Sequence, residues 1–253
     1  MNDLHILRNT LKDLFRFKKL LVVLLISVLP LLVAVLWRAV TPADQFVKAD
    51  VYNRLSELIV FGFVLVMLAC VFGTNLVAQE VEQKTIVYLL TRPVPRWRIL
   101  LMKYAAAVIA TIVAAWLASG LLLLVTGGAS TTGKIAFGHD LGILAIGSLT
   151  YGGLFLLFAT MFRRPLIVGL LYTFGLESWL PSLPGNFKLL SLMAYLRELA
   201  AHPVAAPVDV TDVAQDPMSP ALAWKVVIAV IVVTVTAACI VFTRSEYVPR
   251  DDV

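Results

Sequence analysis

Long apolar stretches alternate with short charged segments along the chain. Five stretches of at least 18 residues contain no Asp, Glu, Lys or Arg: 20–37, 58–79, 104–133, 141–162 and 226–243. A helix of about 20 apolar residues can cross the hydrocarbon core of a bilayer, so each stretch predicts a transmembrane helix. A sixth stretch, 165–176, is short but apolar and continues through Glu177 to Leu180. The pattern therefore predicts six transmembrane helices, with spans 1–5 inside 20–180 and span 6 at 226–243.

The segment before the first span has a different pattern. Residues 1–19 carry basic side chains on several sides, while their apolar residues recur three and four positions apart, at Leu4, Leu7, Leu11, Leu14 and Phe15. This spacing predicts an amphipathic helix on the inner leaflet. A cytoplasmic extension of the first span is the alternative interpretation.

The longest polar segment, 181–225, lies between the fifth and sixth spans. Its apolar residues share one helical face at Leu189, Leu192, Met193, Leu196 and Leu199. We expect a short helix here that dips into the outer interface before the last span. The residues after this helix are rich in Pro and Asp and predict a loop.

The segment between the second and third spans reads AQEVEQKTIVYLLTRPVPRWRILLMKY. Residues 79–91 predict a short amphipathic helix, since Pro93 and Pro95 end the helical pattern. A connecting loop that lies on the lipid is the simpler interpretation. However, a helix on an anionic leaflet should begin with basic residues, and this one begins with Glu80 and Glu82. Its apolar residues also exceed what a connecting turn needs, which indicates that another surface covers them.

Composition agrees with a membrane protein. The chain has 253 residues, of which 60% are hydrophobic and 15% are charged, against about 25% charged in soluble domains. Mean hydropathy is +0.90. The predicted fold is all-α: one polytopic transmembrane domain over 1–253, with an N-terminal interfacial helix and a short outer helix before the last span.

Basic residues predict the orientation. Segments that would be cytoplasmic if the N-terminus were inside hold 14 Lys and Arg, and the outer segments hold 7. The positive-inside rule then places both termini in the cytoplasm, with 244–253 as a cytoplasmic tail. The net charge of +5 is explained by topology and anionic lipid. It requires no nucleic-acid partner.

Small residues inside the spans have packing interpretations. Gly147, Gly152 and Gly153 in the fourth span predict close contact between helices. Cys70 and Cys239 also lie in apolar spans and predict packing positions.

A glycine-rich segment resembles a phosphate-binding loop. Gly128 and Gly133-Lys134 have the spacing of that motif, but Ile135 stands where a Ser or Thr would hold magnesium. The segment joins two predicted spans on the outer side, and no polar segment is long enough for a nucleotide-binding domain. We therefore expect no nucleotide site on this chain. We also expect no catalytic or metal site, because the histidines lie outside the spans, at His5, His139 and His202.

One ionisable residue lies within the predicted spans. Glu177 is near the outer end of the fifth span, beside Trp179. Such a residue is costly in a membrane and is often functional, so a substrate-path or gating role for Glu177 and Trp179 stays open beside a packing role. An ion-coupled secondary transporter needs groups of this kind in mid-membrane. That class and a non-transport membrane scaffold remain alternatives.

The cytoplasmic segment carries a recognisable pattern, E-x-E-x-x-T-x-x-x-L-L-x-x-P-x-x-R followed by Lys103. Its residues are Glu80, Glu82, Thr85, Leu89, Leu90, Pro93 and Arg96. The pattern resembles the first cytoplasmic loop of the permease subunits of type-2 ABC exporters. Many relatives have Gly before the Thr, whereas this chain has Lys84. The resemblance extends to the order of spans and so covers nearly the whole chain.

The resemblance implies a function. Such permeases are not enzymes; they pair as two copies, a homodimer here unless a different permease is the partner. Each copy docks on a separate ATPase subunit through a coupling helix, here about 79–91, and the seven pattern residues would contact that subunit. ATP and Mg would be bound by the two ATPase copies, with no cofactor on this chain. The resemblance implies a multi-pass protein of the cell's inner, cytoplasmic membrane, and it leaves the substrate open.

Overall fold

Helices account for nearly all of the described chain. The computed structural model describes residues 10, 17–40, 48–82, 95–126, 137–177, 189–200 and 219–244. No strand occurs among them. The main elements are α2 (Phe17–Val40), α3 (Lys48–Leu55), the π-helix η1 (Ser56–Leu65), α4 (Val66–Glu82), α6 (Arg96–Thr126), α8 (Phe137–Met161), α9 (Pro165–Leu171), the π-helix η2 (Tyr172–Glu177), α10 (Leu192–Ala200) and α11 (Pro220–Arg244).

Five helical stretches are long and apolar enough to cross a membrane. They are Leu21–Val40, Ala49–Leu76, Trp97–Thr126, Phe137–Met161 and Pro220–Arg244. These correspond to five of the six predicted spans. The remaining prediction corresponds to a shorter apolar helix, Pro165–Glu177, which at about 1.5 Å per residue reaches ~20 Å of a hydrocarbon core of ~30 Å. The all-α polytopic fold is confirmed.

The second span begins earlier than the sequence pattern predicts. We expected it from residue 58, but α3, η1 and α4 follow one another without a break from 48 to 82. Asn53 and Ser56 are buried there, at 7% and 0% exposure. Packing against the neighbouring helices thus keeps polar residues in the first part of this helix, and a charge-free criterion starts the span too late.

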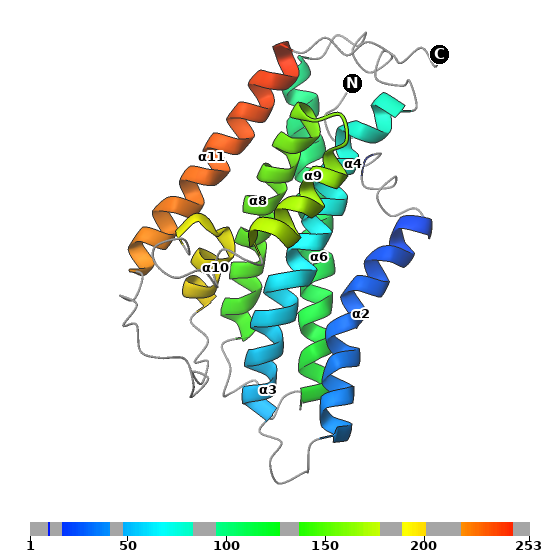
Figure 1. The fold of residues 1–253 in the computed structure, drawn as a ribbon, viewed down its shortest axis with the longest axis vertical. Helices are drawn as coiled ribbons and strands as arrows, with labels where there is room; N and C mark the ends of the chain where they lie inside the picture. Colours follow the sequence, from blue (N-terminus) through cyan, green and yellow to red (C-terminus); the bar gives the residue numbers. More distant parts are fainter. Residues whose placement is uncertain are drawn as a thin grey trace.

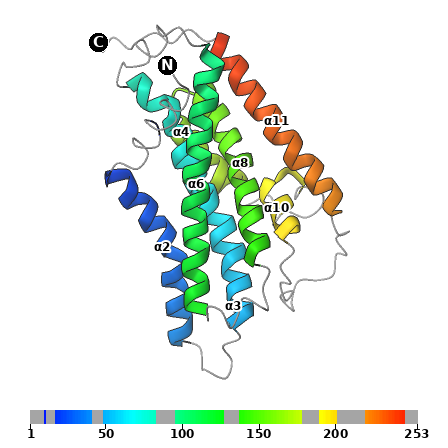
Figure 2. The ribbon, with the colours of Figure 1, turned by 180° about the vertical axis from the view of Figure 1, so that it is seen from behind.

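The helices form one bundle. In Figures 1 and 2, α4, α6 and α8 run side by side through its centre, α2 packs along α6, and α11 packs along α8. α9 lies against α4 and α8, and α10 lies against α11, α8 and η1. The core contains large side chains that are fully buried, among them Tyr52, Phe61, Leu65, Tyr151 and Phe155.

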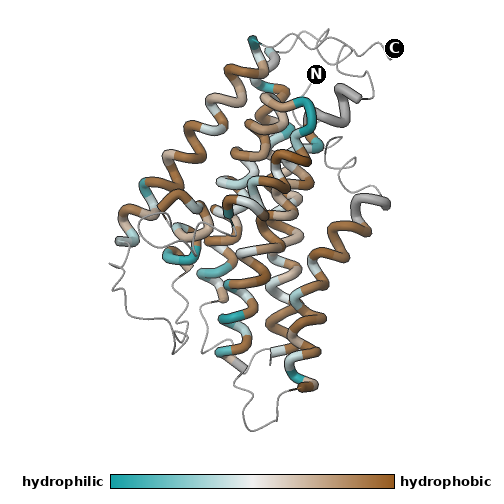
Figure 3. The backbone as a smooth tube through the Cα atoms, viewed as in Figure 1, coloured by the Kyte–Doolittle hydropathy of each residue, from teal (hydrophilic) through white to brown (hydrophobic). Residues whose placement is uncertain are grey.

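The outer surface of the bundle is apolar. Figure 3 shows hydrophobic residues along the lengths of the helices, with hydrophilic residues near their ends. Within its apolar window, α2 has only 17% of residues buried and α11 has 22%, against 72% for Ala49–Leu76. Leu25, Leu36 and Val233 are each at least 64% exposed. Helices that expose apolar side chains along their length need a lipid environment, which makes this a multi-pass membrane protein.

Close approach of the helices depends on α8 glycines. A Cβ atom on Gly153 would lie 2.6 Å from Thr234 Oγ1 of α11, and one on Gly147 would lie 2.6 Å from Leu65 Cδ2 of η1. A Cβ on Gly152 would lie 3.2 Å from Val108 Cγ2 of α6. A larger side chain at Gly147 or Gly153 would therefore require the neighbouring side chain to move. The prediction of close helix contact at the α8 glycines is confirmed.

Hydrogen bonds also join the spans. Ser27 Oγ donates to the Ala114 carbonyl at 3.4 Å, which links α2 to α6. Tyr104 Oη donates to the Leu149 carbonyl at 2.8 Å, which links α6 to α8. Such bonds matter in lipid, because no water competes for the polar groups.

The predicted outer helix is present as α10. Four of the five residues predicted on its apolar face, Leu192, Met193, Leu196 and Leu199, are buried together with Tyr195. This face packs against α8, α11 and η1, whereas we expected it in the membrane interface. Leu189 differs: it lies before α10 and is 38% exposed. The interfacial helix predicted at 1–19 falls outside the described residues, except for Thr10 and the first turn of α2.

Candidate functional site

The predicted coupling segment begins inside a span helix. Glu80 and Glu82 lie in the last turn of α4, which runs unbroken from Val66. We expected a separate helix that starts near residue 79, with both carboxylates at its N-terminal end. Since neither Gly nor Pro lies between Thr74 and Glu82, nothing in the sequence interrupts the helix. Of the other predicted contact residues, Thr85, Leu89, Leu90 and Pro93 lie outside the described part.

Helix α6 begins directly after this segment. Arg96 is its first residue, and the Arg98 N–H donates to the Pro95 carbonyl at 3.0 Å. Trp97 is 47% exposed. An exposed Trp beside arginines at a helix end is typical of the membrane–water interface. Segment 83–95 therefore connects the last turn of α4 to the first turn of α6.

Lys103 joins α4 and α6, the two helices on either side of this segment. Its side chain is 5% exposed, and its Nζ donates to the Leu76 carbonyl of α4 at 3.2 Å. Leu76 lies one helical turn before Glu80, so the contact is close to the base of segment 83–95. The positive ammonium near the C-terminal end of α4 also interacts favourably with the negative end of the helix dipole. The sequence pattern included Lys103 but gave no indication of this contact.

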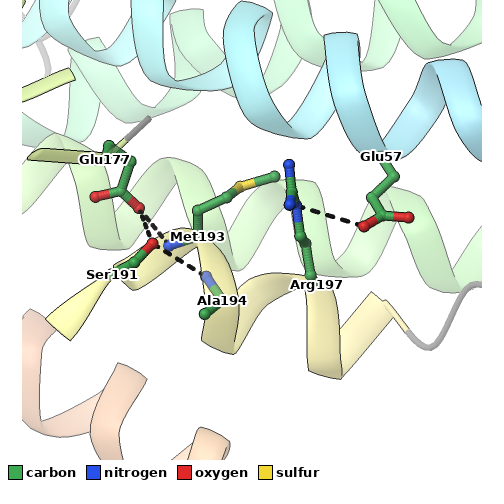
Figure 4. A network of polar contacts seen from close by, with 6 residues as sticks. All are labelled: Glu57, Glu177, Ser191, Met193, Ala194 and Arg197. Carbon is green, nitrogen blue, oxygen red and sulfur yellow. Dashed lines mark hydrogen bonds and ion pairs between the residues drawn. The ribbon is translucent and has the colours of Figure 1, made fainter. Parts of the chain in front are cut away.

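A second polar group surrounds Glu177, the last residue of η2. Glu177 is 5% exposed, and its Oε1 accepts hydrogen bonds from Tyr151 Oη at 2.7 Å and Ser191 Oγ at 2.9 Å. The Met193 N–H of α10 donates to the same oxygen. Figure 4 shows how the carboxylate faces the start of α10. Glu177 therefore has several buried partners, and Trp179, predicted beside it, lies outside the described residues.

The opposite end of α10 carries an ion pair. Arg197 Nε lies 3.5 Å from Glu57 Oε1 of η1, and the side chains are 35% and 21% exposed. A Cβ on Gly62 would lie 3.6 Å from Arg197 Nη2 and 3.7 Å from Met193 Cε. Helix α10 thus rests on a small residue of η1, and Figure 4 shows the pair beside the Glu177 contacts. Sequence reasoning did not single out either Glu57 or Arg197.

A third polar cluster joins α3, α6 and α8. Tyr52 Oη donates to Asp140 Oδ2 at 3.1 Å and lies 3.2 Å from Ser119 Oγ. Asp140 and Ser119 are fully buried. Asp140 was expected outside the fourth span, because the charge-free stretch begins one residue later.

Ionisable residues lie deeper in the helices than the sequence indicated. We excluded ionisable groups from five of the six spans, yet Glu57, Lys103 and Asp140 all lie within the candidate spans of the structure. The charge-free criterion had moved them into loops. Because such groups are present, an ion-coupled carrier cannot be rejected for lack of them. The choice between an ion-coupled carrier and an ABC permease has to come from other evidence.

Metal chemistry has no support in the part of the chain that the structure describes. No group of three or more His, Cys, Asp and Glu could hold a metal ion there. Cys70 and Cys239 are free thiols, the first of them buried. The glycine-rich segment 128–135 lies outside the described residues, so its expected lack of nucleotide binding stays a prediction.

Comparison with known proteins decides between the two classes of transporter. The search of curated proteins found no match. A family model described as ABC-2 family transporter protein matches residues 4–170. The match includes the helices from α2 to α8 and the segment between α4 and α6, and it covers more than half of the chain. Together with the apolar helical bundle, it shows that this chain belongs to the ABC-2 family of transporter proteins.

Proposed function

We propose that the chain is the permease subunit of an ATP-binding cassette exporter. It forms the substrate pathway and carries no ATPase of its own. Two copies pair as a homodimer and bind two copies of a separate ATPase subunit, which hold ATP and Mg. The observation that carries the proposal is the match of the ABC-2 family over residues 4–170, because ABC transporters draw their energy from an ATPase.

The coupling site in this proposal is segment 79–96. Glu80 and Glu82 would meet basic side chains or N–H groups of the ATPase, with Thr85, Leu89, Leu90, Pro93 and Arg96 completing the contact. The position of the segment supports this role, since it follows α4 and precedes α6. Movement of the ATPase would then act on two spans at once.

Helix geometry gives such movement a path across the membrane. The helices α3, η1 and α4 contain 8, 10 and 17 residues in one continuous run, which extends about 50 Å at 1.5 Å per residue. Its cytoplasmic end in the proposal is Glu82. Its other part carries Glu57, which pairs with Arg197 of α10. A displacement at the coupling segment therefore has a direct mechanical connection to α10.

Isolation of the complex tests the proposal. A tagged full-length chain purified from its native membrane should retain a subunit with ATPase activity at equal stoichiometry. The chain separated from this subunit should neither bind nor hydrolyse ATP. Saturable ATP binding by the isolated chain that is abolished by Lys134→Ala would contradict the proposal, because the nucleotide site would then lie at 128–135.

The proposed orientation in the inner membrane rests on the distribution of Lys and Arg, 14 inside against 7 outside. In intact cells, an impermeant thiol reagent should label cysteines placed at Ser130 and Asp212. Cysteines at Gln83 and Ser245 should react only after permeabilisation. The reverse pattern would place segment 79–96 outside the cell, where no ATPase could reach it.

A further inference from the structure

Four exposed arginines lie on three helical segments of the bundle. Arg98 is in the first turn of α6, Arg163 and Arg164 lie in the turn between α8 and α9, and Arg244 is the last residue of α11. We call these four residues the arginine cluster. Among the described residues, no hydrogen bond or ion pair involves the guanidinium groups of Arg163, Arg164 or Arg244.

The packing of α8 on α11 brings two parts of the cluster to the same height. A Cβ atom on Gly153 would lie 2.6 Å from Thr234 Oγ1, so the two helices cross closely at this point. Both helices run in the same direction in Figure 1. Ten residues further along each chain, about 15 Å from the crossing at 1.5 Å per residue, stand Arg163 and Arg244. The turn after α8 therefore lies level with the end of α11.

Helix α6 adds the third part of the cluster. A Cβ atom on Gly152 would lie 3.2 Å from Val108 Cγ2, and α6 runs opposite to α8. Ten residues back from Val108, Arg98 therefore reaches the level of the turn after α8. Figures 1 and 2 both show the end of α11 beside the start of α6, with this turn close to them. Figure 3 shows hydrophilic residues at the end of α11 and in the turn.

The chemistry of the cluster suits a phosphate group. All four cations are arginines, whose planar guanidinium groups can each donate two parallel hydrogen bonds to phosphate oxygens. Basic sites of this kind between transmembrane helices bind the headgroups of anionic lipids. The positive-inside rule accounts for the number of basic residues at this end of the spans. It does not require that arginines from three segments meet at one level.

Apolar side chains continue from the cluster along the bundle. Trp97 and Phe162, which neighbour the arginines in sequence, are 47% and 40% exposed, and Leu166 and Ile167 in the first turn of α9 are 40% and 55% exposed. A free phosphate ion would use the arginines alone. A phospholipid needs a cationic site for its headgroup and an apolar surface for its acyl chains, and here the two are adjacent.

We propose that the arginine cluster binds the phosphate headgroup of an anionic phospholipid. The acyl chains lie along the exposed apolar residues of α9. The bound lipid connects α6, α9 and α11 beside segment 83–95, because α6 begins directly after this segment. The assignment to the inner leaflet rests on the orientation in the proposed function, whereas the headgroup site itself depends only on the fold.

Lipid binding to the full-length permease tests the site. Native mass spectrometry follows a titration with phosphatidylglycerol, and zwitterionic phosphatidylcholine is the reference lipid. The test variant combines Arg163→Gln, Arg164→Gln and Arg244→Gln. Each arginine near an anionic headgroup contributes about fivefold in affinity, so binding of phosphatidylglycerol should weaken by about a hundredfold. Binding of phosphatidylcholine should stay unchanged.

A control variant removes the same charge from the opposite ends of the spans. It combines Arg38→Gln, Arg54→Gln and Lys225→Gln, all at exposed positions, and it should bind phosphatidylglycerol as the native permease does. The test variant keeps 14 − 3 = 11 of the inner Lys and Arg against 7 outside, so it should insert in the native orientation. A loss of lipid binding can then be assigned to the cluster.

A lysine variant separates a built site from general attraction. Arg163→Lys, Arg164→Lys and Arg244→Lys keep the charge but lose the forked donors, and binding of phosphatidylglycerol should weaken several-fold. Equal binding by the lysine variant and the native permease would overturn the site. Unchanged binding in the glutamine variant would also overturn it, as would an equal loss in the control variant, because net charge would then explain the binding.

Two further outcomes concern other occupants of the cluster. Displacement of the bound lipid by excess inorganic phosphate would overturn the lipid assignment, since the arginines would then hold a free anion. Loss of the ATPase from the glutamine variant together with normal lipid binding would place the cluster in the ATPase interface and overturn the lipid site. Because lipid binding is measured on the permease alone, its failure would leave the proposed function intact.

Discussion

Reversing Glu80 and Glu82 to lysine should leave the permease in the membrane and remove its ATPase subunit. Each lost contact of a carboxylate with a charged or N–H partner costs on the order of 1.5–3 kcal/mol. Two such losses should weaken docking by more than a hundredfold. Recovery of the ATPase with the tagged double variant, measured against permease level, should therefore fall to background, and ATP-driven transport should fall with it.

The position of the two carboxylates indicates that the double variant should be no less stable than the native permease. Glu80 and Glu82 lie at the C-terminal end of α4, where the helix dipole favours lysine over glutamate by about 0.3–1 kcal/mol per exposed site. Added lysines on the cytoplasmic side also agree with the positive-inside rule. The double variant should thus insert normally, and a loss of the ATPase can be assigned to docking.

A matched reversal separates docking from a general effect of charge. Asp209→Lys with Asp212→Lys makes the same change in net charge on the predicted outer loop. This variant should retain the ATPase. If the Glu80 and Glu82 variant kept its full ATPase and its full transport, these carboxylates would have no part in docking.

The sequence predicted most of the spans because their signal is local. A run of about 20 apolar residues needs a bilayer whatever its neighbours are, and five such runs became span-length helices. Close helix contact at the α8 glycines was also predictable, since a residue without a side chain inside a span allows close packing. The amphipathic face of α10 followed from its helical spacing.

Other features depend on contacts between distant segments. The start of the second span was missed because Asn53, Arg54 and Glu57 interrupt the apolar run, while the helix is held by burial against its neighbours. Asp140 was placed in a loop, although Tyr52, 88 positions away, donates to it in the core. The two π-helices have no sequence signal that we could have used.

In the candidate site, too, the sequence identified residues of a local motif but not contacts between distant segments. A motif marked Glu80, Glu82 and Lys103, because the residues of the proposed coupling site lie close together in the sequence. Glu177 was noticed as a lone charge near a span, but its partners come from α8 and from the start of α10. Its environment could be known only once those elements were placed.

Lys103 supplies the second large effect, a loss of coupling without a loss of docking. Its Nζ holds the Leu76 carbonyl of α4 at 3.2 Å, which fixes α6 to the base of segment 83–95. Lys103→Met keeps an unbranched apolar side chain but removes the ammonium. A hydrogen bond from a charged group contributes on the order of 1.5–3 kcal/mol, so the connection between α4 and α6 should loosen by at least tenfold.

We expect the Lys103→Met permease to recover its ATPase in normal amounts, because Glu80 and Glu82 are unchanged. Transport per ATP hydrolysed by the reconstituted complex should fall about tenfold, since α6 no longer follows the end of α4. Lys103→Arg keeps a cation with several donors and should restore much of the coupling. Lys225→Met, at an exposed position of α11, removes the same charge and should leave the ratio unchanged. A normal ratio in Lys103→Met would mean that force reaches the spans without this contact, through the segment itself.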